Sequence, residues 1–183
     1  MLLDTPICDF GWKAPDFTLK NAQGESYTLS DQFGEGGLLI AFICNHCPYV
    51  QSAAPRLAED AALLMAEGIN VLAIMSNDYQ RVAADSPENM KRFADQFGFS
   101  FPYLIDQDQS VGKRYGAICT PDFFGFNSKG ELQYRGRLDN VRMGGSADNR
   151  VPELVNAMRR VAVTGRGPEK QSPSMGCSIK WRG

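Results

Sequence analysis

Two cysteines three positions apart, Cys44 and Cys47, are the residues of this chain whose type and spacing best suit chemistry. They lie in the motif Cys-Asn-His-Cys-Pro, which follows an apolar run at residues 38–43 and ends at Pro48. The apolar run predicts a buried strand. Pro48 predicts the start of a helix, because its ring pre-sets the helical φ and lacks only an N–H that the first turn does not use. A helix N-terminus presents unpaired N–H groups and partial positive charge, which lower the pKa of a cysteine there from about 8.5 to between about 3.5 and 7.5. The motif therefore predicts a site of reversible thiol–disulfide chemistry.

His46, the only histidine of the chain, lies between the two thiols in sequence. A protonated imidazole beside a thiolate stabilises the thiolate and makes the cysteine a better leaving group. Because histidine titrates near neutral pH, we expect His46 to tune the pair. The alternative is that His46 only packs at the start of the helix.

The elements that must position this motif are predicted from hydrophobic periodicity and from turn residues. We expect strands at residues 17–20, 26–29, 38–43, 69–75, 101–106, 123–126 and 132–138. We expect helices from 48 to about 67, at 86–97 with Ser86 as the N-cap, at 110–115 and at 147–162. Right-handed crossovers make the third and fourth strands parallel neighbours, which places Cys44 at the carboxyl end of a central strand, where α/β sheets bind ligands. This order predicts an α/β, thioredoxin-like fold with an N-terminal β-hairpin and a C-terminal tail.

Length and composition predict a single domain over residues 1–183, with an N-terminal segment at 1–13 and a tail at 165–183. Nineteen basic and 21 acidic residues give a net charge of −2 without any cluster of Lys and Arg, so we expect no nucleic-acid partner. The longest apolar run is too short to span a bilayer and no signal peptide is recognisable, so we expect no membrane partner. Five cysteines, an odd count, fit poorly with a secreted disulfide framework, which favours a cytoplasmic location.

Four segments spread along most of the chain carry a resemblance to a known family. They are Ala14-Pro15-Asp16-Phe17, the dithiol motif with Tyr49-Val50, Cys119-Thr120-Pro121-Asp122-Phe123-Phe124, and Gly176-Cys177-Ser178-Ile179-Lys180-Trp181. Together they resemble the peroxiredoxin-like branch of the thioredoxin superfamily. The resemblance implies that Cys44 is the exposed nucleophile, that Cys47 is the resolving thiol, and that Pro121 is a cis-proline facing the disulfide. It also implies that Thr120 offers backbone hydrogen bonds to an extended substrate, so that Thr120 and Pro121 form the substrate-binding edge.

The chain departs from both well-known patterns of this superfamily. Peroxiredoxins have their peroxidatic cysteine at the place of Cys47, a threonine at the place of Cys44, and an arginine at or next to the place of Pro121. Thioredoxins have a buried aspartate where Leu38 stands and a tryptophan where Ile43 stands. We expect these departures to disfavour efficient peroxide chemistry and to require another route for the proton of Cys47. DsbA-type oxidases also have a histidine before the second cysteine, so we expect a reduction potential above the roughly −270 mV of thioredoxin.

Three further thiols lie outside the motif. Cys119 directly precedes the predicted substrate-binding edge, where it is either a third redox thiol or a small buried hydrophobe. Cys177 lies in the tail, where docking would let it act as a resolving thiol. Alternatively, Ile179 and Trp181 anchor the tail for structural reasons only. Cys8 is expected to be inert.

Thiolate and imidazole groups also bind zinc and copper. Cys44, His46 and Cys47, with Cys119 nearby, offer such groups. The chain has no second Cys-x-x-Cys and no remote histidine to complete a tetrahedral site. We therefore expect no dedicated metal site, and no other cofactor.

The function that these residues favour is thiol–disulfide oxidoreduction. In this hypothesis Cys44 attacks a disulfide of a protein or small molecule, Cys47 resolves the mixed disulfide, and an unidentified reductant recycles the pair. Two alternatives stay open: a thiol peroxidase with an antioxidant role that uses Cys44 or Cys47, and a non-catalytic redox sensor or metal-binding module.

Overall fold

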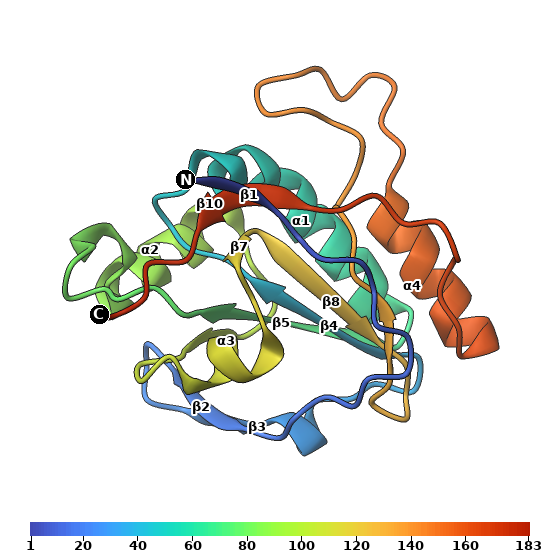
Figure 1. Cartoon of the computed structure of the whole chain (residues 1–183), viewed down its shortest axis with the longest axis horizontal. Coiled ribbons are helices and arrows are strands. Elements are labelled where there is room, and N and C mark those ends of the chain that lie inside the picture. Colours follow the sequence, from blue (N-terminus) through green and yellow to red (C-terminus); the bar gives the residue numbers. More distant parts are fainter.

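The computed structural model, which describes residues 1–183, is built on a seven-stranded sheet with the order β3-β2-β6-β5-β4-β8-β9 (Figure 1). Its strands are β2 (Thr18–Asn21), β3 (Ser26–Thr28), β4 (Gly37–Phe42), β5 (Ile69–Met75), β6 (Tyr103–Ile105), β8 (Asp122–Phe126) and β9 (Leu132–Tyr134). β4 pairs antiparallel with β8 and parallel with β5. The parallel pair is the one that a right-handed crossover predicts. β2 and β3 form the expected N-terminal hairpin, and β2 pairs antiparallel with β6. The predicted thioredoxin-like α/β fold is confirmed.

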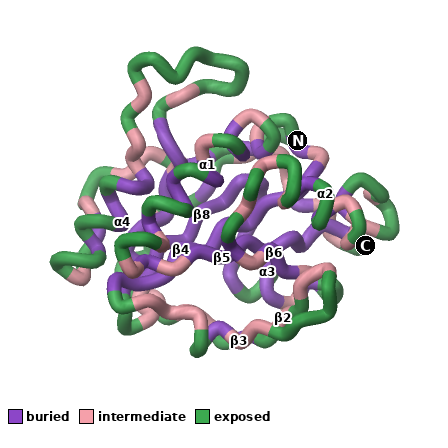
Figure 2. The backbone as a smooth tube through the Cα atoms, turned by 180° about the vertical axis from the view of Figure 1, so that it is seen from behind, coloured by how far each residue is buried: buried purple, intermediate pink, exposed green.

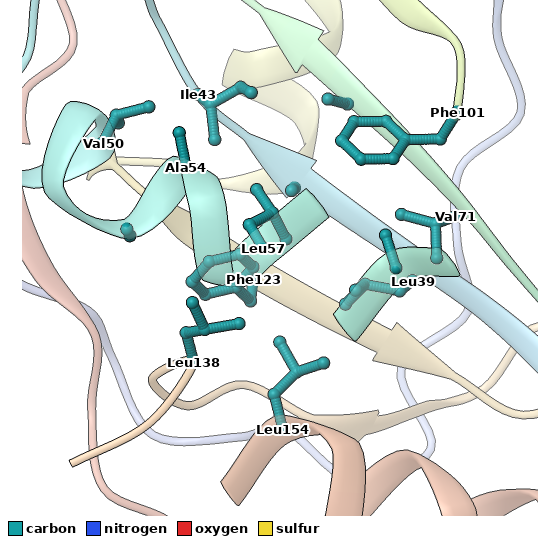
Figure 3. Close-up of a cluster of buried hydrophobic side chains, with 14 of the residues drawn as sticks. Leu39, Ile43, Val50, Ala54, Leu57, Val71, Phe101, Phe123, Leu138 and Leu154 are labelled. Carbon is teal, nitrogen blue, oxygen red and sulfur yellow. The ribbon is translucent and has the colours of Figure 1, made fainter. Parts of the chain in front are cut away.

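Strand β4 is buried along its whole length because helices or loops cover both faces of the sheet (Figure 2). Leu39 and Ala41 face a core shared with α1 (Pro48–Ala66), α2 (Pro87–Phe97) and α4 (Glu153–Thr164). Figure 3 shows this cluster, with side chains of the sheet lying beside those of α1 and α4. Leu38 and Ile40 face a second core that includes Tyr115 of α3 (Ser110–Tyr115). The alternation explains why the run was apolar at every position.

The helices next to the dithiol begin where the sequence predicts. Helix α1 starts at Pro48, directly after Cys47 as its N-cap. Helix α2 starts at Pro87 after the short 3-10 helix η2 (Ala83–Asp85), and its N-cap Ser86 accepts a hydrogen bond from the N–H of Asn89 at 3.3 Å. A further 3-10 helix, η1 (Leu29–Asp31), follows β3. None of the helices is both long and apolar enough to span a bilayer.

Two expected boundaries are wrong. Helix α4 begins at Glu153 rather than at 147, and residues 140–152 form a projecting, largely exposed loop (Figures 1 and 2). The side chain of Asn140 bonds the carbonyl of Asn149 and the N–H of Val151, so local side-chain bonds close this loop where helical turns were expected. Strand β9 ends at Tyr134 rather than at 138, because the N–H of Arg137 turns to the carbonyl of Ser172 in the C-terminal tail.

The two terminal segments, together with the short strand β7 from the middle of the chain, form a second, three-stranded sheet that the sequence did not predict. β10 (Met175–Ser178) lies between β1 (Leu2–Asp4) and β7 (Cys119–Thr120), antiparallel to both (Figure 1). Cys177 is the partner of Leu2 on one side and of Thr120 on the other. Beyond β10, Ile179 is buried and Trp181 packs against the second core, as anchors of the tail should. The tail is therefore part of the fold beside the dithiol.

Candidate redox site

The two thiols of the motif lie between the end of β4 and the start of α1, and each is near enough to shift the pKa of the other. Both residues are fully buried, with 0% exposure. The sulfur of Cys44 is 3.3 Å from Oγ1 of Thr120, and the sulfur of Cys47 is 3.3 Å from the carbonyl oxygen of the same residue. The expectation that Cys44 is exposed is wrong, because β7 and the tail close over this end of the sheet.

The site distributes charge unequally between the two sulfurs. A hydrogen bond from Cys44 lowers the pKa of Cys47, and further bonds from Cys177 and from the N–H of Val50 in the first turn of α1 lower it too. As the donor in the shared bond, Cys44 has its pKa raised, and both burial and the negative charge of Asp85 raise it further. These contacts favour the thiolate at Cys47, at the helix N-terminus, over Cys44, at the strand end.

Asp85 is a functional residue that the sequence analysis missed. It ends the 3-10 helix η2 and is completely buried. Its Oδ2 lies 2.6 Å from Nδ1 of His46 and accepts from the amide of Asn77 at 2.9 Å. Its Oδ1 accepts the backbone N–H groups of Asn45 at 2.8 Å and of His46 at 3.2 Å. One carboxylate thus fixes the backbone between the two cysteines and the ring of the histidine.

This ion pair shifts both of its members toward their charged forms. The hydrogen bond from Asp85 raises the pKa of His46. Burial opposes ionisation of Asp85, but the bonds from His46, Asn77 and the backbone hold the pKa of that carboxyl below its usual value. The negative charge of Cys47 raises the pKa of His46 further. A ring nitrogen of His46 and the sulfur of Cys44 lie within 4.8 Å of each other, and the expected tuning of the pair by His46 remains a prediction.

The polar loops after β4 and β5 meet around this pair because parallel strands end at the same edge of the sheet. Asn45 donates to the carbonyl of Ala84 at 3.0 Å and accepts from the hydroxyl of Tyr103 at 3.0 Å. Gln51 of α1 donates to the carbonyl of Asn45 at 2.8 Å. An acidic residue in the loop after β5 is the only sequence signal for Asp85, and Asp78 of the same loop satisfies it equally well.

Thr120 and Pro121 lie against the dithiol, and their peptide bond is cis, as the resemblance implied. The expected open edge at Thr120 is not open, because Cys177 of β10 pairs with Thr120 in an antiparallel register. A Cβ on Gly176 would overlap the Thr120 carbonyl, so glycine is required for this close approach. The chain's own tail thus occupies the edge that we expected to bind a substrate strand.

The three remaining thiols differ in their access to the dithiol. Cys177, half-buried, forms hydrogen bonds to Cys47, and burial together with that contact raises its pKa to about 11. Burial raises the pKa of Cys119 to about 12, and its thiol donates to the carbonyl of Pro121 at 3.8 Å. Burial likewise raises the pKa of Cys8 to about 11. Only Cys177 combines contact with the site and partial exposure.

The donor atoms of Cys44, His46 and Asp85 lie within 4.8 Å of one another, a grouping with ligand types that metal ions use. This set differs from the one considered in the sequence, since it contains Asp85 and lacks Cys47 and Cys119. Both oxygens of Asp85 already accept two hydrogen bonds each from protein groups. The carboxylate is therefore satisfied within the protein.

A groove of about 600 Å³ opens beside Pro121. Tyr49 of α1, Met175 of β10 and Arg142 of the projecting loop contribute to its walls. Its lining mixes apolar and polar groups, as is usual for sites that hold peptides or small molecules. The groove gives a ligand a place next to the redox site.

A dithiol that begins the helix after a central strand, next to a cis-proline on a thioredoxin-like fold, defines a thiol-redox protein of the thioredoxin-like class. The model of the AhpC/TSA family matches residues 10–135, and the chain belongs to this family. The match contains both cysteines of the motif, while β10 with Cys177 lies beyond it.

The chain is similar to both oxidoreductases and peroxiredoxins. The thiol-disulfide oxidoreductase ResA of Halalkalibacterium halodurans is 26% identical over 85% of this chain and 81% of its own length. A candidate peroxiredoxin of Mycobacterium tuberculosis is 28% identical over 67% of this chain and 73% of its own length. The crystal structure of a hypothetical protein from Sinorhizobium meliloti superimposes with a TM-score of 0.91 at 38% identity, over 98% of this chain and 97% of that one.

Proposed function

We propose that the protein is a thiol–disulfide oxidoreductase in which Cys44 and Cys47 form the redox couple. The observation that carries this proposal is the pair of sulfurs at the N-terminus of α1, each 3.3 Å from an atom of Thr120 beside the cis-proline. A thiolate is the attacking species in disulfide exchange, and an adjacent thiol allows the mixed disulfide to be resolved. The similarity to ResA supports the same reaction class.

In the reaction, an enzyme thiolate attacks one sulfur of a substrate disulfide. The substrate S–S bond breaks, a mixed disulfide forms and the first substrate thiolate leaves. The second enzyme sulfur, on losing its proton, attacks the enzyme sulfur of the mixed disulfide. The Cys44–Cys47 disulfide forms, and the second substrate thiol leaves with that proton. The substrate is reduced by two electrons and the enzyme couple is oxidised by two.

The order of attack is open to a direct test. The resemblance predicts that Cys44 attacks first, whereas the charge distribution favours Cys47, because its thiolate is stabilised by the helix terminus and by His46. Trapping separates the two orders: the variant that lacks the resolving thiol accumulates a mixed disulfide, and the variant that lacks the attacking thiol does not. With Cys177 also replaced by serine, so that this neighbouring thiol cannot resolve the mixed disulfide, attack by Cys47 predicts accumulation with Cys44→Ser, and attack by Cys44 predicts it with Cys47→Ser.

The overall activity is tested by reduction of insulin as a protein disulfide and of oxidised glutathione as a small one. We expect the reduced protein to convert at least one of them, with the Cys44→Ser and Cys47→Ser variants each losing turnover. Cys119→Ser is a matched control, since its buried thiol contacts neither sulfur of the couple. Turnover that survives removal of both motif cysteines would overturn the proposal.

A second candidate is a thiol peroxidase that uses Cys47. The specific observation in its favour is the low pKa of Cys47 at the helix N-terminus, together with the similarity to a candidate peroxiredoxin. Against it, the threonine and arginine places of peroxiredoxins hold Cys44 and Pro121. Rapid hydrogen peroxide turnover that persists in Cys44→Ser would favour the peroxidase over the oxidoreductase.

We also propose a cytoplasmic setting, a disulfide-containing protein or small molecule as substrate, and a separate reductant that recycles the couple. The five cysteines are all free thiols in the structure, which suits a reducing compartment. The groove beside Pro121 suits a peptide or small ligand next to the couple. Stoichiometric zinc or copper in the purified protein, without disulfide reduction, would instead favour a metal-binding or sensor role. Cell fractionation tests the location.

A further inference from the structure

The C-terminal strand β10 lies where a partner strand was expected. It pairs with β7 so that Cys177 stands opposite Thr120, the residue that contacts both sulfurs of the couple. β1 covers the other edge of β10 through the pairing of Leu2 with Cys177. The absence of a side chain at Gly176 lets the strand approach the Thr120 carbonyl. The fold therefore presents a cysteine to the dithiol on an ordered strand, from a segment beyond the family match.

Three sulfurs gather around Thr120 at this point. Cys177 packs against the buried cluster that contains Cys44 and Cys47, and both Cys44 and Cys177 lie near enough to Cys47 to lower its pKa. Cys44 and Cys47 are fully buried, whereas Cys177 is partly exposed. A reagent in solution therefore meets Cys177 before it meets either sulfur of the couple.

We propose that Cys177 is a third redox thiol of this site, which exchanges with the Cys44–Cys47 disulfide to form a Cys47–Cys177 disulfide. The exchange moves the disulfide from the buried pair to a sulfur that external thiols and disulfides can reach. This proposal rests on the proposed function, because it needs the Cys44–Cys47 couple to become oxidised by a substrate disulfide.

The exchange is balanced without any further reagent. The Cys177 sulfur attacks the Cys47 sulfur, the Cys44–Cys47 bond breaks, and the Cys47–Cys177 bond forms. Cys44 leaves as a thiolate and takes the proton that Cys177 gives up. One disulfide is present before and after, so no electrons are gained or lost. An external dithiol then attacks the Cys177 sulfur, breaks the Cys47–Cys177 bond and releases the Cys47 thiolate. The second thiol of the reductant attacks its own sulfur in the mixed disulfide, which releases Cys177 and leaves the reductant as a disulfide.

The acidity of Cys177 is consistent with this sequence of steps. In the reduced protein, burial and the hydrogen bond and charge of Cys47 raise its pKa to about 11, so it remains a thiol that donates to the Cys47 thiolate. When Cys47 is in a disulfide, that charge is absent. The positive charge of the nearby Lys180 lowers the pKa of Cys177. Once Cys47 is in a disulfide, its charge no longer raises the pKa of Cys177 against this effect.

Tryptic mapping tests the exchange directly because trypsin places the motif cysteines, Cys119 and Cys177 on three different peptides. Cys44 and Cys47 lie in the peptide 21–56, Cys119 in 115–129 and Cys177 in 171–180. In Cys44→Ser, oxidised with oxidised glutathione and then alkylated, we expect peptide 21–56 linked to 171–180. The link must be absent from Cys44→Ser/Cys177→Ser and retained in Cys44→Ser/Cys119→Ser. A link from 115–129 in place of 171–180, or glutathione on Cys47 without a link, would overturn the proposal.

Kinetics with the intact couple give the second measurement. We expect Cys177→Ser to form the Cys44–Cys47 disulfide inside peptide 21–56 but to be re-reduced by dithiothreitol about tenfold or more slowly, because the buried disulfide loses its accessible exchange partner. Cys177→Ser re-reduced at the wild-type rate would overturn the proposal. Failure of the wild type to form a disulfide within 21–56 would refute the proposed function instead, so the two failures are distinguishable.

Discussion

The placement of the thiolate on Cys47 gives the most direct test of the physical argument. Its stabilisation has a named source in the Cys44 thiol, which donates a hydrogen bond to it. We therefore predict that Cys44→Ala raises the pKa of Cys47. Cys44→Ser retains a donor of similar reach, and we predict a smaller rise.

The size of the effect follows from the strength of such a bond. A hydrogen bond to a charged group contributes about 1.5–3 kcal/mol, and each pKa unit corresponds to about 1.4 kcal/mol. Loss of the Cys44 donor should therefore raise the pKa of Cys47 by about 1 to 2 units. The N–H of Val50 and the contacts from Cys177 remain in place, so the pKa of Cys47 in Cys44→Ala should still lie below that of an ordinary thiol.

The assay is a pH titration of thiolate absorbance in the ultraviolet, with alkylation rates as an independent check. Background is low because burial raises the pKa of Cys8 and Cys177 to about 11 and that of Cys119 to about 12. One thiolate should therefore appear in the wild type well below the ordinary cysteine pKa of about 8.5. Cys47→Ser should show none in that range, because the remaining Cys44 is buried beside Asp85.

The opposite pattern would refute this reasoning. If Cys47→Ser keeps the low-pH thiolate and Cys44→Ser loses it, the charge lies on Cys44. The helix terminus and His46 would then stabilise the strand-end sulfur, as the resemblance predicted, and the roles proposed from the electrostatics would be reversed.

Three further predictions follow from the surroundings of the dithiol. The hydrogen bond from Asp85 raises the pKa of His46, so Asp85→Asn should lower the pKa of His46. NMR can follow the titration of this residue, the single histidine of the chain, and an unchanged titration midpoint would contradict the ion pair. The contribution of His46 to folding stability is full at a pH below its unfolded pKa of about 6.5, and it is lost as the pH rises through its raised folded pKa. The contribution of Asp85 is present at a pH above its unfolded pKa of about 3.9, and it is lost as the pH falls through its lowered folded pKa. The stability deficit of Asp85→Asn, about 2 kcal/mol by denaturant unfolding, should thus be largest between these limits. Arg150→Ala leaves the buried carboxylate of Asp60 without its partner, while Asp139 keeps its pair with Arg56, and it should cost about 3 kcal/mol or more. Arg159→Ala, which breaks an exposed pair with Glu67, should cost clearly less, and equal losses would refute the burial argument. Gly176→Ala should cost about 1–3 kcal/mol and speed alkylation of Cys177 by displacing β10 from Thr120, and wild-type alkylation would show that the strand tolerates a side chain there.

Most of the central fold could be predicted because its information is local. The apolar run became β4 within one residue of its expected limits, and Pro48 and Ser86 marked the starts of α1 and α2. Right-handed crossover geometry then fixed β5 beside β4 without any knowledge of side-chain contacts. The loop at 140–152 was misjudged as helix because side-chain bonds of Asn140, which periodicity does not reveal, close it.

The candidate site likewise contains residues that local sequence patterns predict and residues that only the folded chain reveals. Cys44, Cys47 and the cis peptide before Pro121 were predicted from the motif and the resemblance. Asp85 was not, although it organises the site: it acts across 39 residues of sequence on His46, and the loop that carries it has no distinctive pattern. The aspartate that thioredoxins have at the place of Leu38 is absent, yet the fold brings a buried carboxylate to the dithiol from another element.

The sequence by itself determined that the chain holds a redox dithiol at a strand-to-helix junction of a thioredoxin-like sheet, because spacing, helix-starting residues and apolar runs are local properties. The tertiary structure decided which sulfur carries the charge, because that depends on Val50, Asp85 and Cys177, which only folding brings together. It also decided that the edge at Thr120 is covered. β10 lies 57 residues further along the chain at Cys177, and its pairing with Thr120 is a long-range contact that no local pattern encodes.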